Sequence, residues 1–118
     1  MSDQPLHEQH CTAIAKGEPP LAPDEVRALL AALDPPWELV ADGQAIQRRF
    51  EFRNYYRTLA FVNAVAWIAH RADHHPDMEF GYNRCLVRYS THAVGGLSRN
   101  DFICAARVNR LLDGEAPH

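Results

Sequence analysis

Residues 70–101 read HRADHHPDMEFGYNRCLVRYSTHAVGGLSRND, and this stretch determines how the rest of the chain is organised. It contains four of the seven histidines, which are His70, His74, His75 and His92. Pro76 follows the doublet and disfavours helical geometry at the residue before it, so we expect His74 and His75 at or just past the end of a helix. His92 lies shortly before the loop signal Gly95-Gly96. Histidines gathered at the ends of elements suggest an acid–base pocket.

The same stretch predicts two strands and the start of a helix. Residues 78–82 are expected to form a short strand and residues 84–91 a second one. In the second strand Cys85, Val87, Tyr89 and Thr91 share one face, and Leu86, Arg88, Ser90 and His92 share the other. Ser98 precedes the final helix, and Asp101 stands three residues later, at the spacing of a capping box. Gly114 and Pro117 are expected to end that helix.

Upstream of the histidines, residues 54–72 predict a long helix that is capped by Asn54. Its apolar residues surround the helix instead of forming one stripe. In a protein of 118 residues, one sheet cannot cover the whole circumference of such a helix. We therefore expect its second face to contact another subunit in an oligomer.

The first half of the chain begins with a polar segment, residues 1–20, which contains prolines and is expected to form an extended or partly disordered arm. A helix is then expected from Pro23 to the Pro35-Pro36 pair. Its inward stripe consists of Val26, Leu29, Leu30 and Leu33.

Two strands follow that helix. Residues 37–40 predict a short strand, Asp42-Gly43 predicts a turn, and residues 46–53 alternate as a second strand. Arg48 interrupts the apolar face near the start of the second strand, where we expect the strand to be open to water.

The order of elements is therefore α-β-β-α-β-β-α, with short hairpin connections inside each strand pair. This order predicts an α+β fold, in which a four-stranded antiparallel sheet carries α-helices on one face. The length fits one domain, which we place at residues 21–118.

Composition narrows the classes of function. The formal net charge is -3, so no basic surface indicates nucleic acid binding. The three cysteines form no C-x-x-C pair, which fits free thiols in a reducing cytosol. The sequence shows no signal peptide and no apolar run of the ~20 residues that a membrane span needs. We expect a soluble cytoplasmic protein without a membrane partner.

The histidines allow three interpretations. A single histidine at a strand end is usually a surface or core residue. A metal site would use His70 and His74, which are four residues apart, but there is no H-E-x-x-H motif and no cysteine close in sequence. His7, His10 and Cys11 in the arm lack a fourth ligand nearby.

Acid–base chemistry requires less than a metal site. Imidazole has an unperturbed pKa near ~6.5 and can donate or accept a proton at neutral pH. No serine or cysteine has a recognisable nucleophile setting, and no glycine-rich loop has a phosphate-binding context. The pattern favours proton transfer alone, such as a dehydration, with neither metal nor cofactor.

These residues resemble the pterin-4a-carbinolamine dehydratase family. The resemblance covers nearly the whole chain, from about Cys11 and Leu21 to Leu112. Its most specific part is His74-His75-Pro76 followed at the family's spacing by Tyr82, His92 and Asp101. The phrases Tyr82-Asn83, Ser90-Thr91-His92 and Gly96-Leu97-Ser98 are also similar to the family.

The resemblance implies a 4a-hydroxytetrahydrobiopterin dehydratase, a hydro-lyase that converts 4a-hydroxytetrahydropterin to quinonoid dihydropterin. It implies a place in tetrahydrobiopterin recycling beside an aromatic amino acid hydroxylase, and a homodimer or homotetramer. It gives His74 and His75 the roles of general acid and base, and His92 the roles of binding the pterin and sharing in proton transfer. The implied contacts to the substrate ring are Asp73, Ser90, Thr91 and Ala93.

Two roles stay open. Asp101 is explained either by helix capping or by orienting a histidine, and Tyr82 either packs beside the ring or belongs to the core. The sequence also departs from the family at His70, where an acidic residue is common, and at Ala22, where Ser or Thr usually caps. A charged His70 would lower the pKa of a neighbouring histidine and change the pH optimum.

The alternative to an enzyme is a non-catalytic protein of the same fold: a scaffold, a dimerisation cofactor of a transcription factor, or an assembly chaperone. The presence of His74, His75 and His92 together argues against a purely structural descendant. A further enzymatic alternative is work on another pterin, for instance around molybdopterin.

Overall fold

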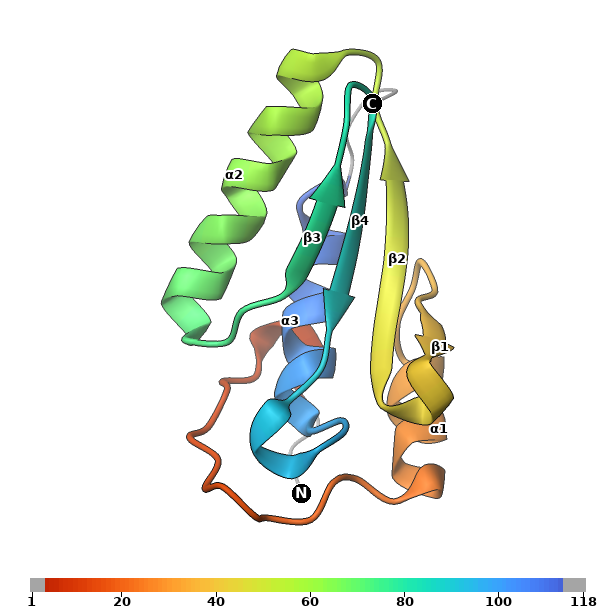
Figure 1. The fold of residues 1–118 in the computed structure, drawn as a ribbon, viewed down its shortest axis with the longest axis vertical. Helices are drawn as coiled ribbons and strands as arrows, with labels where there is room; N and C mark the ends of the chain where they lie inside the picture. Colours follow the sequence, from red (N-terminus) through yellow and green to blue (C-terminus); the bar gives the residue numbers. More distant parts are fainter. Residues whose placement is uncertain (1–3, 114–118) are drawn as a thin grey trace.

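Four antiparallel strands form one sheet in the spatial order β1-β2-β4-β3 (Figure 1). The computed structural model describes residues 4–113. The strands are β1 (Glu38–Val40), β2 (Ala45–Glu51), β3 (Asp77–Phe80) and β4 (Arg84–Tyr89). β1 pairs with β2, β3 pairs with β4, and β2 pairs with β4, so that Ile46 lies opposite Tyr89. The two predicted hairpins therefore join through their second strands.

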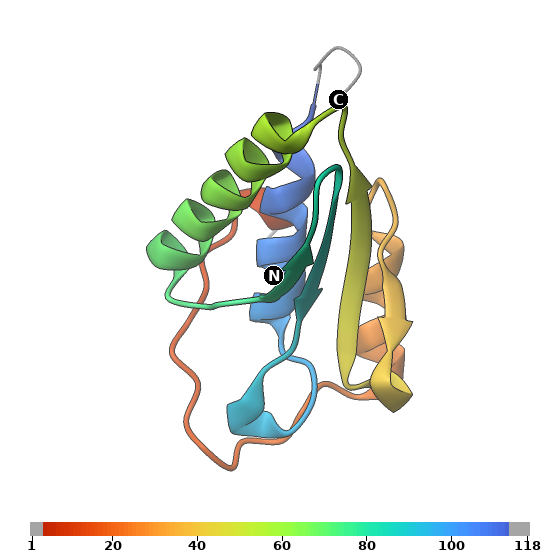
Figure 2. The ribbon, with the colours of Figure 1, turned by 45° about the horizontal axis from the view of Figure 1, so that its top comes forward.

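Within the described residues, three α-helices cover one face of this sheet: α1 (Pro23–Ala31), α2 (Tyr55–Ala72) and α3 (Arg99–Arg110). α3 lies between α1 and α2 and contacts both (Figure 1 and Figure 2). The predicted α+β fold and its order of elements are confirmed. Gly114 and Pro117, the predicted end of the last helix, lie outside the described residues. Within residues 4–113, no helix is long and apolar enough to cross a membrane.

The core lies between β4 and α3. Every second side chain of β4 is buried, namely Cys85, Val87 and Tyr89, as the alternation predicted. Phe102 and Val108 of α3 are fully buried against this face of the sheet. Burying one apolar side chain of this kind contributes about 1.5–3 kcal/mol to stability. This packing fixes α3 across the sheet, and with it the residues at the start of α3.

α2 is buried along a single stripe, which consists of Thr58, Phe61, Val65 and Ala69. Asn54 caps the helix as predicted, because its side chain accepts a hydrogen bond from the Arg57 N–H at 2.9 Å. Away from the stripe, Tyr56 and Trp67 are 80% and 60% exposed. A second apolar face of α2 is therefore uncovered in the single chain.

Arg48 in β2 differs from the expectation that it is open to water. Its side chain is half-buried and donates a hydrogen bond to Asn109 Oδ1 at 2.6 Å. Its guanidinium also lies 4.3 Å from the centre of the Phe50 ring. The same Asn109 oxygen accepts a hydrogen bond from Trp37 Nε1 at 2.8 Å. The guanidinium is thus hydrogen-bonded and stacked on an aromatic ring inside the fold, which is how an arginine is accommodated on a partly buried face.

The N-terminal arm, residues 4–20, packs along α3 and then passes the 3₁₀ turn His92–Val94 before it reaches α1 (Figure 1). Arg107 of α3 donates hydrogen bonds to two carbonyl oxygens of the arm. Farther along, the Gly17 N–H donates to the Ala93 carbonyl at 2.9 Å. The arm is extended and attached at several points, whereas its separation from a domain at residue 20 stays a prediction.

Candidate active site

The end of α2 places the histidine doublet. Asp73 follows the last helical residue in the left-handed conformation, with φ 51° and ψ 43°, which an aspartate tolerates better than most residues. The His74 N–H then returns to the carbonyl of Ala69 at 3.2 Å and closes the helix. This turn directs the His74 side chain toward the start of α3, and it confirms the predicted position of the doublet just past a helix.

Asp101 lies in the first turn of α3 and its side chain is 0% exposed. Its Oδ1 contacts His74 Nε2 at 2.6 Å. Its Oδ2 accepts hydrogen bonds from Thr91 Oγ1 at 2.8 Å and from the Ser98 N–H at 2.9 Å. Asp101 therefore makes both contacts that were considered for it, because one oxygen makes the capping contact with Ser98 and the other contacts a histidine.

The hydroxyl of Ser98 extends this network. Ser98 Oγ lies 2.7 Å from Thr91 Oγ1. Since Thr91 gives its proton to Asp101, Ser98 must be the donor in the contact between the two hydroxyls. The buried carboxylate is thus surrounded by donors on both oxygens, which is the arrangement that stabilises a buried negative charge.

The environment of His74 favours its charged form. Burial by itself would lower the pKa of His74, but the hydrogen bond and the negative charge of Asp101 outweigh burial and raise that pKa above 6.5. The His74 side chain is 12% exposed. The Tyr89 ring stacks nearly parallel to the imidazole, with centroids 5.8 Å apart and planes 7° apart. Asp101 therefore both orients the His74 ring and favours its charged form.

A cavity of about 430 Å³ opens over His74. All seven residues that were expected to contact a substrate line it: Asp73, His74, His75, Ser90, Thr91, His92 and Ala93. Asp101 is buried behind His74, while His75 and His92 are exposed at the rim. The fold thus brings together the end of α2, the end of β4 and the turn after it.

Sequence reasoning missed four residues of this cavity. They are Thr12, Ala13 and Ile14 from the arm, and Asn100 from the first turn of α3. Thr12 and Asn100 are 88 positions apart in sequence, and no local pattern in the arm indicates that it reaches α3. Only Asn100 lies inside the stretch that the histidines singled out.

Tyr82 and His70, which the sequence also singled out, lie away from the cavity. Tyr82 is 63% exposed and stacks on Tyr55, with ring centroids 6.4 Å apart. It therefore neither belongs to the core nor lines the cavity of its own chain. His70 is exposed and packs against Trp67, with ring centroids 5.7 Å apart. Within residues 4–113, no three His, Cys, Asp or Glu side chains are grouped so that they could hold a metal ion.

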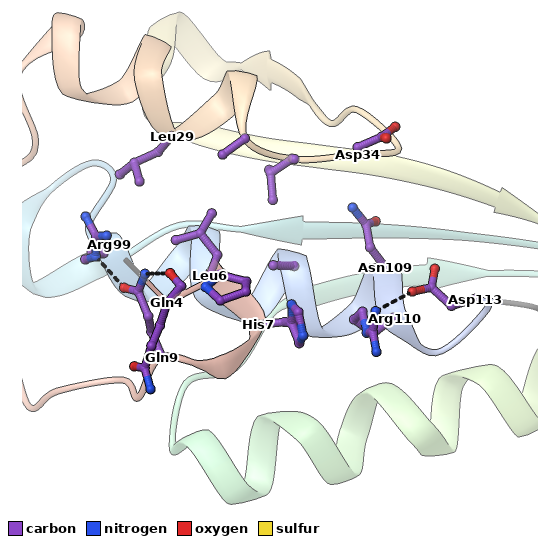
Figure 3. Close-up of a pocket in the computed structure, with 14 residues that line it drawn as sticks. Gln4, Leu6, His7, Gln9, Leu29, Asp34, Arg99, Asn109, Arg110 and Asp113 are labelled. Carbon is purple, nitrogen blue, oxygen red and sulfur yellow. Dashed lines mark hydrogen bonds and ion pairs between the residues drawn. The ribbon is translucent and has the colours of Figure 1, made fainter. Parts of the chain in front are cut away.

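A second cavity, of about 340 Å³, lies between residues 4–9 of the arm, α1 and α3 (Figure 3). Both arginines that line it have partners: Arg99 Nε donates a hydrogen bond to Gln9 Oε1 at 2.8 Å, and a guanidinium nitrogen of Arg110 lies 3.1 Å from Asp113 Oδ2. This cavity contains neither member of the histidine doublet. Of these two cavities, the histidine doublet therefore lines only the first.

Comparison with known proteins gives one consistent result. The family model described as pterin 4 alpha carbinolamine dehydratase matches residues 19–111. A protein of Nitrosomonas eutropha that is provisionally named pterin-4-alpha-carbinolamine dehydratase is 56% identical over 107 residues, which are 91% of this chain and 93% of the relative. A protein of Xanthomonas campestris with the same provisional name is 56% identical over 109 residues, 92% of each chain.

Two solved structures are also similar. The crystal structure of a transcriptional coactivator/pterin dehydratase from Brucella melitensis has a TM-score of 0.73 and 33% identity, and it covers 78% of this chain and 97% of its own. A pterin dehydratase-like protein described as a RuBisCO assembly factor in the alpha-carboxysome has a TM-score of 0.56 and 25% identity, and covers 68% and 92%. From the family model and the curated relatives together, the chain belongs to the pterin 4 alpha carbinolamine dehydratase family.

Proposed function

We propose that this protein is a dehydratase that removes water from 4a-hydroxytetrahydropterin and releases quinonoid dihydropterin. Family membership and the names of the relatives support this reaction class. The single observation that carries the proposal is His74, which lines a cavity of sufficient size and is held by the buried carboxylate of Asp101 at 2.6 Å. That pair provides a protonated imidazole at the place where a leaving hydroxyl needs a proton.

The reaction breaks one C–O bond and forms one C=N bond. The lone pair of the ring nitrogen beside the carbinol carbon expels the hydroxyl, which leaves as water once it has received a proton. Hydroxide is a poor leaving group, so protonation of this oxygen is the step that most needs a general acid. The ring nitrogen then loses its own proton to a base, and the product is neutral quinonoid dihydropterin.

We assign the acid to His74. Its Nε2 is held by Asp101, and its Nδ1 has no hydrogen-bond partner among residues 4–113, so Nδ1 is the nitrogen that can meet a substrate. His75 is the base, and His92 at the rim binds the pterin and shares in proton transfer. Asp73, Ser90, Thr91 and Ala93 contact the ring. Asp101 acts through His74 and is a positioning residue.

The physiological setting follows from the product. Quinonoid dihydropterin is the oxidised form that re-enters tetrahydrobiopterin recycling, so we place the enzyme in the cytoplasm beside an aromatic amino acid hydroxylase. The uncovered apolar face of α2, with Tyr56 and Trp67, supports a homodimer or a homotetramer. The reaction as proposed uses protein side chains alone and requires neither metal nor cofactor.

The assay is dehydration of freshly generated 4a-hydroxytetrahydropterin, followed by ultraviolet absorbance. We expect the wild type to accelerate the reaction. The catalysed rate of His74→Ala should be about 10²–10⁴-fold lower than that of the wild type, which is the range typical of a general acid. His70→Ala is the matched control. This exposed histidine lies outside the cavity and is not among the groups whose charge shifts the pKa of His74, so its loss should leave the rate unchanged. A folded wild type that does not accelerate dehydration would refute the proposal.

A non-catalytic role is the second candidate, and one observation favours it. The relative with a TM-score of 0.56 is described as a RuBisCO assembly factor, so the fold also serves assembly. A scaffold would bind its partner equally well with and without His74. Such a protein would show no dehydration in the same assay, which separates the two candidates.

A further inference from the structure

We propose that residues 12–14 of the N-terminal arm form a wall of the pterin pocket, and that Asn100 is the positioning residue that fixes this wall and thereby sets the affinity for the substrate. The inference rests on the proposed function, because it assigns to the pterin the cavity that His74 lines. Thr12, Ala13 and Ile14 line that cavity together with both residues of the histidine doublet.

Asn100 holds the arm with both ends of its carboxamide. Its Oδ1 accepts a hydrogen bond from the Thr12 N–H at 3.1 Å, and its Nδ2 donates to the Thr12 carbonyl at 2.8 Å. The side chain is buried, so it must keep these partners to avoid an unsatisfied polar group. One side chain thus satisfies the whole main-chain unit of Thr12, as a neighbouring strand would do.

Attachments on either side of residues 12–14 limit how far the wall can move. On one side, Cys11 Sγ lies 3.7 Å from Cys104 Sγ in the middle of α3. On the other side, the Gly17 N–H donates to the carbonyl of Ala93, which itself lines the cavity. Residues 12–16 therefore cross the cavity between Cys11 and Gly17, which are both held by contacts with the rest of the fold. Between these two residues, Asn100 holds the main chain of Thr12 against the start of α3.

The wall offers the groups that a planar heterocycle needs. The main-chain N–H and C=O groups of Ala13 and Ile14 have no partner within the part of the chain that the structure describes. Ile14 adds a half-buried apolar side chain. A pterin presents flat faces and a pyrimidine edge that both donates and accepts hydrogen bonds. The chemistry of the wall therefore matches this class of ligand.

The arm is an addition to the region that defines the family. The family model begins at residue 19, after the wall. The Nitrosomonas eutropha relative nevertheless aligns over 107 of the 118 residues, so its match includes at least residues 12–18. A pocket wall built outside the common region is suited to distinguish members that share the same histidines.

The test compares KM and kcat for 4a-hydroxytetrahydropterin in the full chain. Asn100→Leu keeps the size of the side chain but removes both hydrogen bonds to Thr12, and we expect KM to rise about tenfold with kcat changed less than about twofold. Arg99→Ala is the matched control, because it removes an arm contact with Gln9 at the second cavity and should change neither constant (Figure 3). Ile14→Ala shortens the half-buried apolar side chain of the wall. It should raise KM about threefold, and it gives a test that does not depend on folding of the Asn100 variant.

The outcomes separate this inference from the proposed function. The inference is overturned if KM is unchanged both in a folded Asn100→Leu variant and in Ile14→Ala, or if these variants lose only kcat. In either case the activity of the wild type still supports the proposed function. If the wild type shows no dehydration, binding of 7,8-dihydrobiopterin, measured by quenching of tryptophan fluorescence, decides instead. A Kd about tenfold weaker in Asn100→Leu supports the wall, and an equal Kd or no binding overturns it.

Discussion

At the scale of single residues, the site depends on a buried charge with a complete set of partners. Asp101 receives contacts from His74, Thr91 and Ser98. A buried carboxylate without such partners would destabilise the fold by several kcal/mol. The residue that completes the capping contact of α3 is therefore also the residue that charges the histidine, and stability and function depend on the same side chain.

The first prediction concerns how stability depends on pH. The pKa of His74 is higher in the folded protein than in the unfolded chain. Its pairing with Asp101 therefore contributes fully to the free energy of unfolding below about pH 6.5, the pKa in the unfolded chain. This contribution is lost as pH rises through the higher pKa of the folded protein. We expect the free energy of unfolding in urea to exceed that of His74→Gln by more at pH 6 than at pH 9. Each unit of the raised pKa corresponds to about 1.4 kcal/mol of this difference. An equal difference at both pH values would contradict the raised pKa.

The second prediction concerns Tyr89, whose hydroxyl is buried without a hydrogen-bond partner among the described residues. Tyr89→Phe keeps the ring stacked on His74 and removes the unsatisfied group, so we expect the free energy of unfolding to stay equal or to rise by about 1 kcal/mol. Tyr89→Leu, which removes the stacked ring, serves as the comparison and should be less stable. Urea denaturation measures both, and a Tyr89→Phe variant that is less stable by more than about 1 kcal/mol would show that the hydroxyl has a partner.

Much of the site was predictable at this scale, and the reason is local. Pro76 placed the doublet past a helix end, and the three-residue spacing from Ser98 to Asp101 indicated a cap. The contact between Asp101 and His74 joins positions that are 27 apart, so spacing alone could not distinguish capping from orienting a histidine. The family resemblance suggested this contact, and the structure shows that one carboxylate makes both.

At the scale of elements, α2 and α3 begin after residues that favour helix capping, whereas α1 does not. Ala22 precedes α1 and provides no side-chain cap, although its N–H donates to Glu25 Oε1 at 3.0 Å. We expect Ala22→Ser to raise the free energy of unfolding by about 0.5–1 kcal/mol, because the hydroxyl would accept a hydrogen bond from a free N–H. Ala28→Ser in the middle of α1 is the control and should lower the free energy of unfolding by at most about 0.5 kcal/mol. A thermal melt that shows equal shifts in both variants would contradict the capping argument.

Elements with strong periodicity were predicted well, and their ends less so. The strand expected at residues 84–91 ends at Tyr89, because Thr91 instead bridges Gly96 and closes the loop below the cavity. The path of the arm was not predictable, because polar residues with several prolines carry no periodic pattern. Its course depends on partners such as Asn100 and Arg107, which are 88 and 98 positions away in sequence from the arm residues that they contact.

At the scale of the whole molecule, the uncovered face of α2 is the feature that a single chain does not explain. Trp67 is 60% exposed, and its ring lies beside the exposed residues His70 and Arg71. We expect Trp67→Lys to lower the molar mass of the assembly in solution, measured by sedimentation equilibrium, because the lysine would place a charge in a subunit interface. Ala28→Lys, on the exposed side of α1, is the control and should keep the wild-type mass. A Trp67→Lys variant with unchanged mass would exclude this face as the interface.

The central claim is that Asp101 keeps His74 protonated so that it can act as a general acid. The most direct test is the pH dependence of kcat for dehydration of 4a-hydroxytetrahydropterin in the wild type and in Asp101→Asn. A general acid works only while it carries its proton, so we expect the wild-type rate to fall as pH rises through the raised pKa of His74. In the variant, burial still lowers the pKa of His74 and no carboxylate opposes this effect. The fall in kcat should therefore occur at lower pH. Identical pH profiles in two folded proteins would contradict the claim.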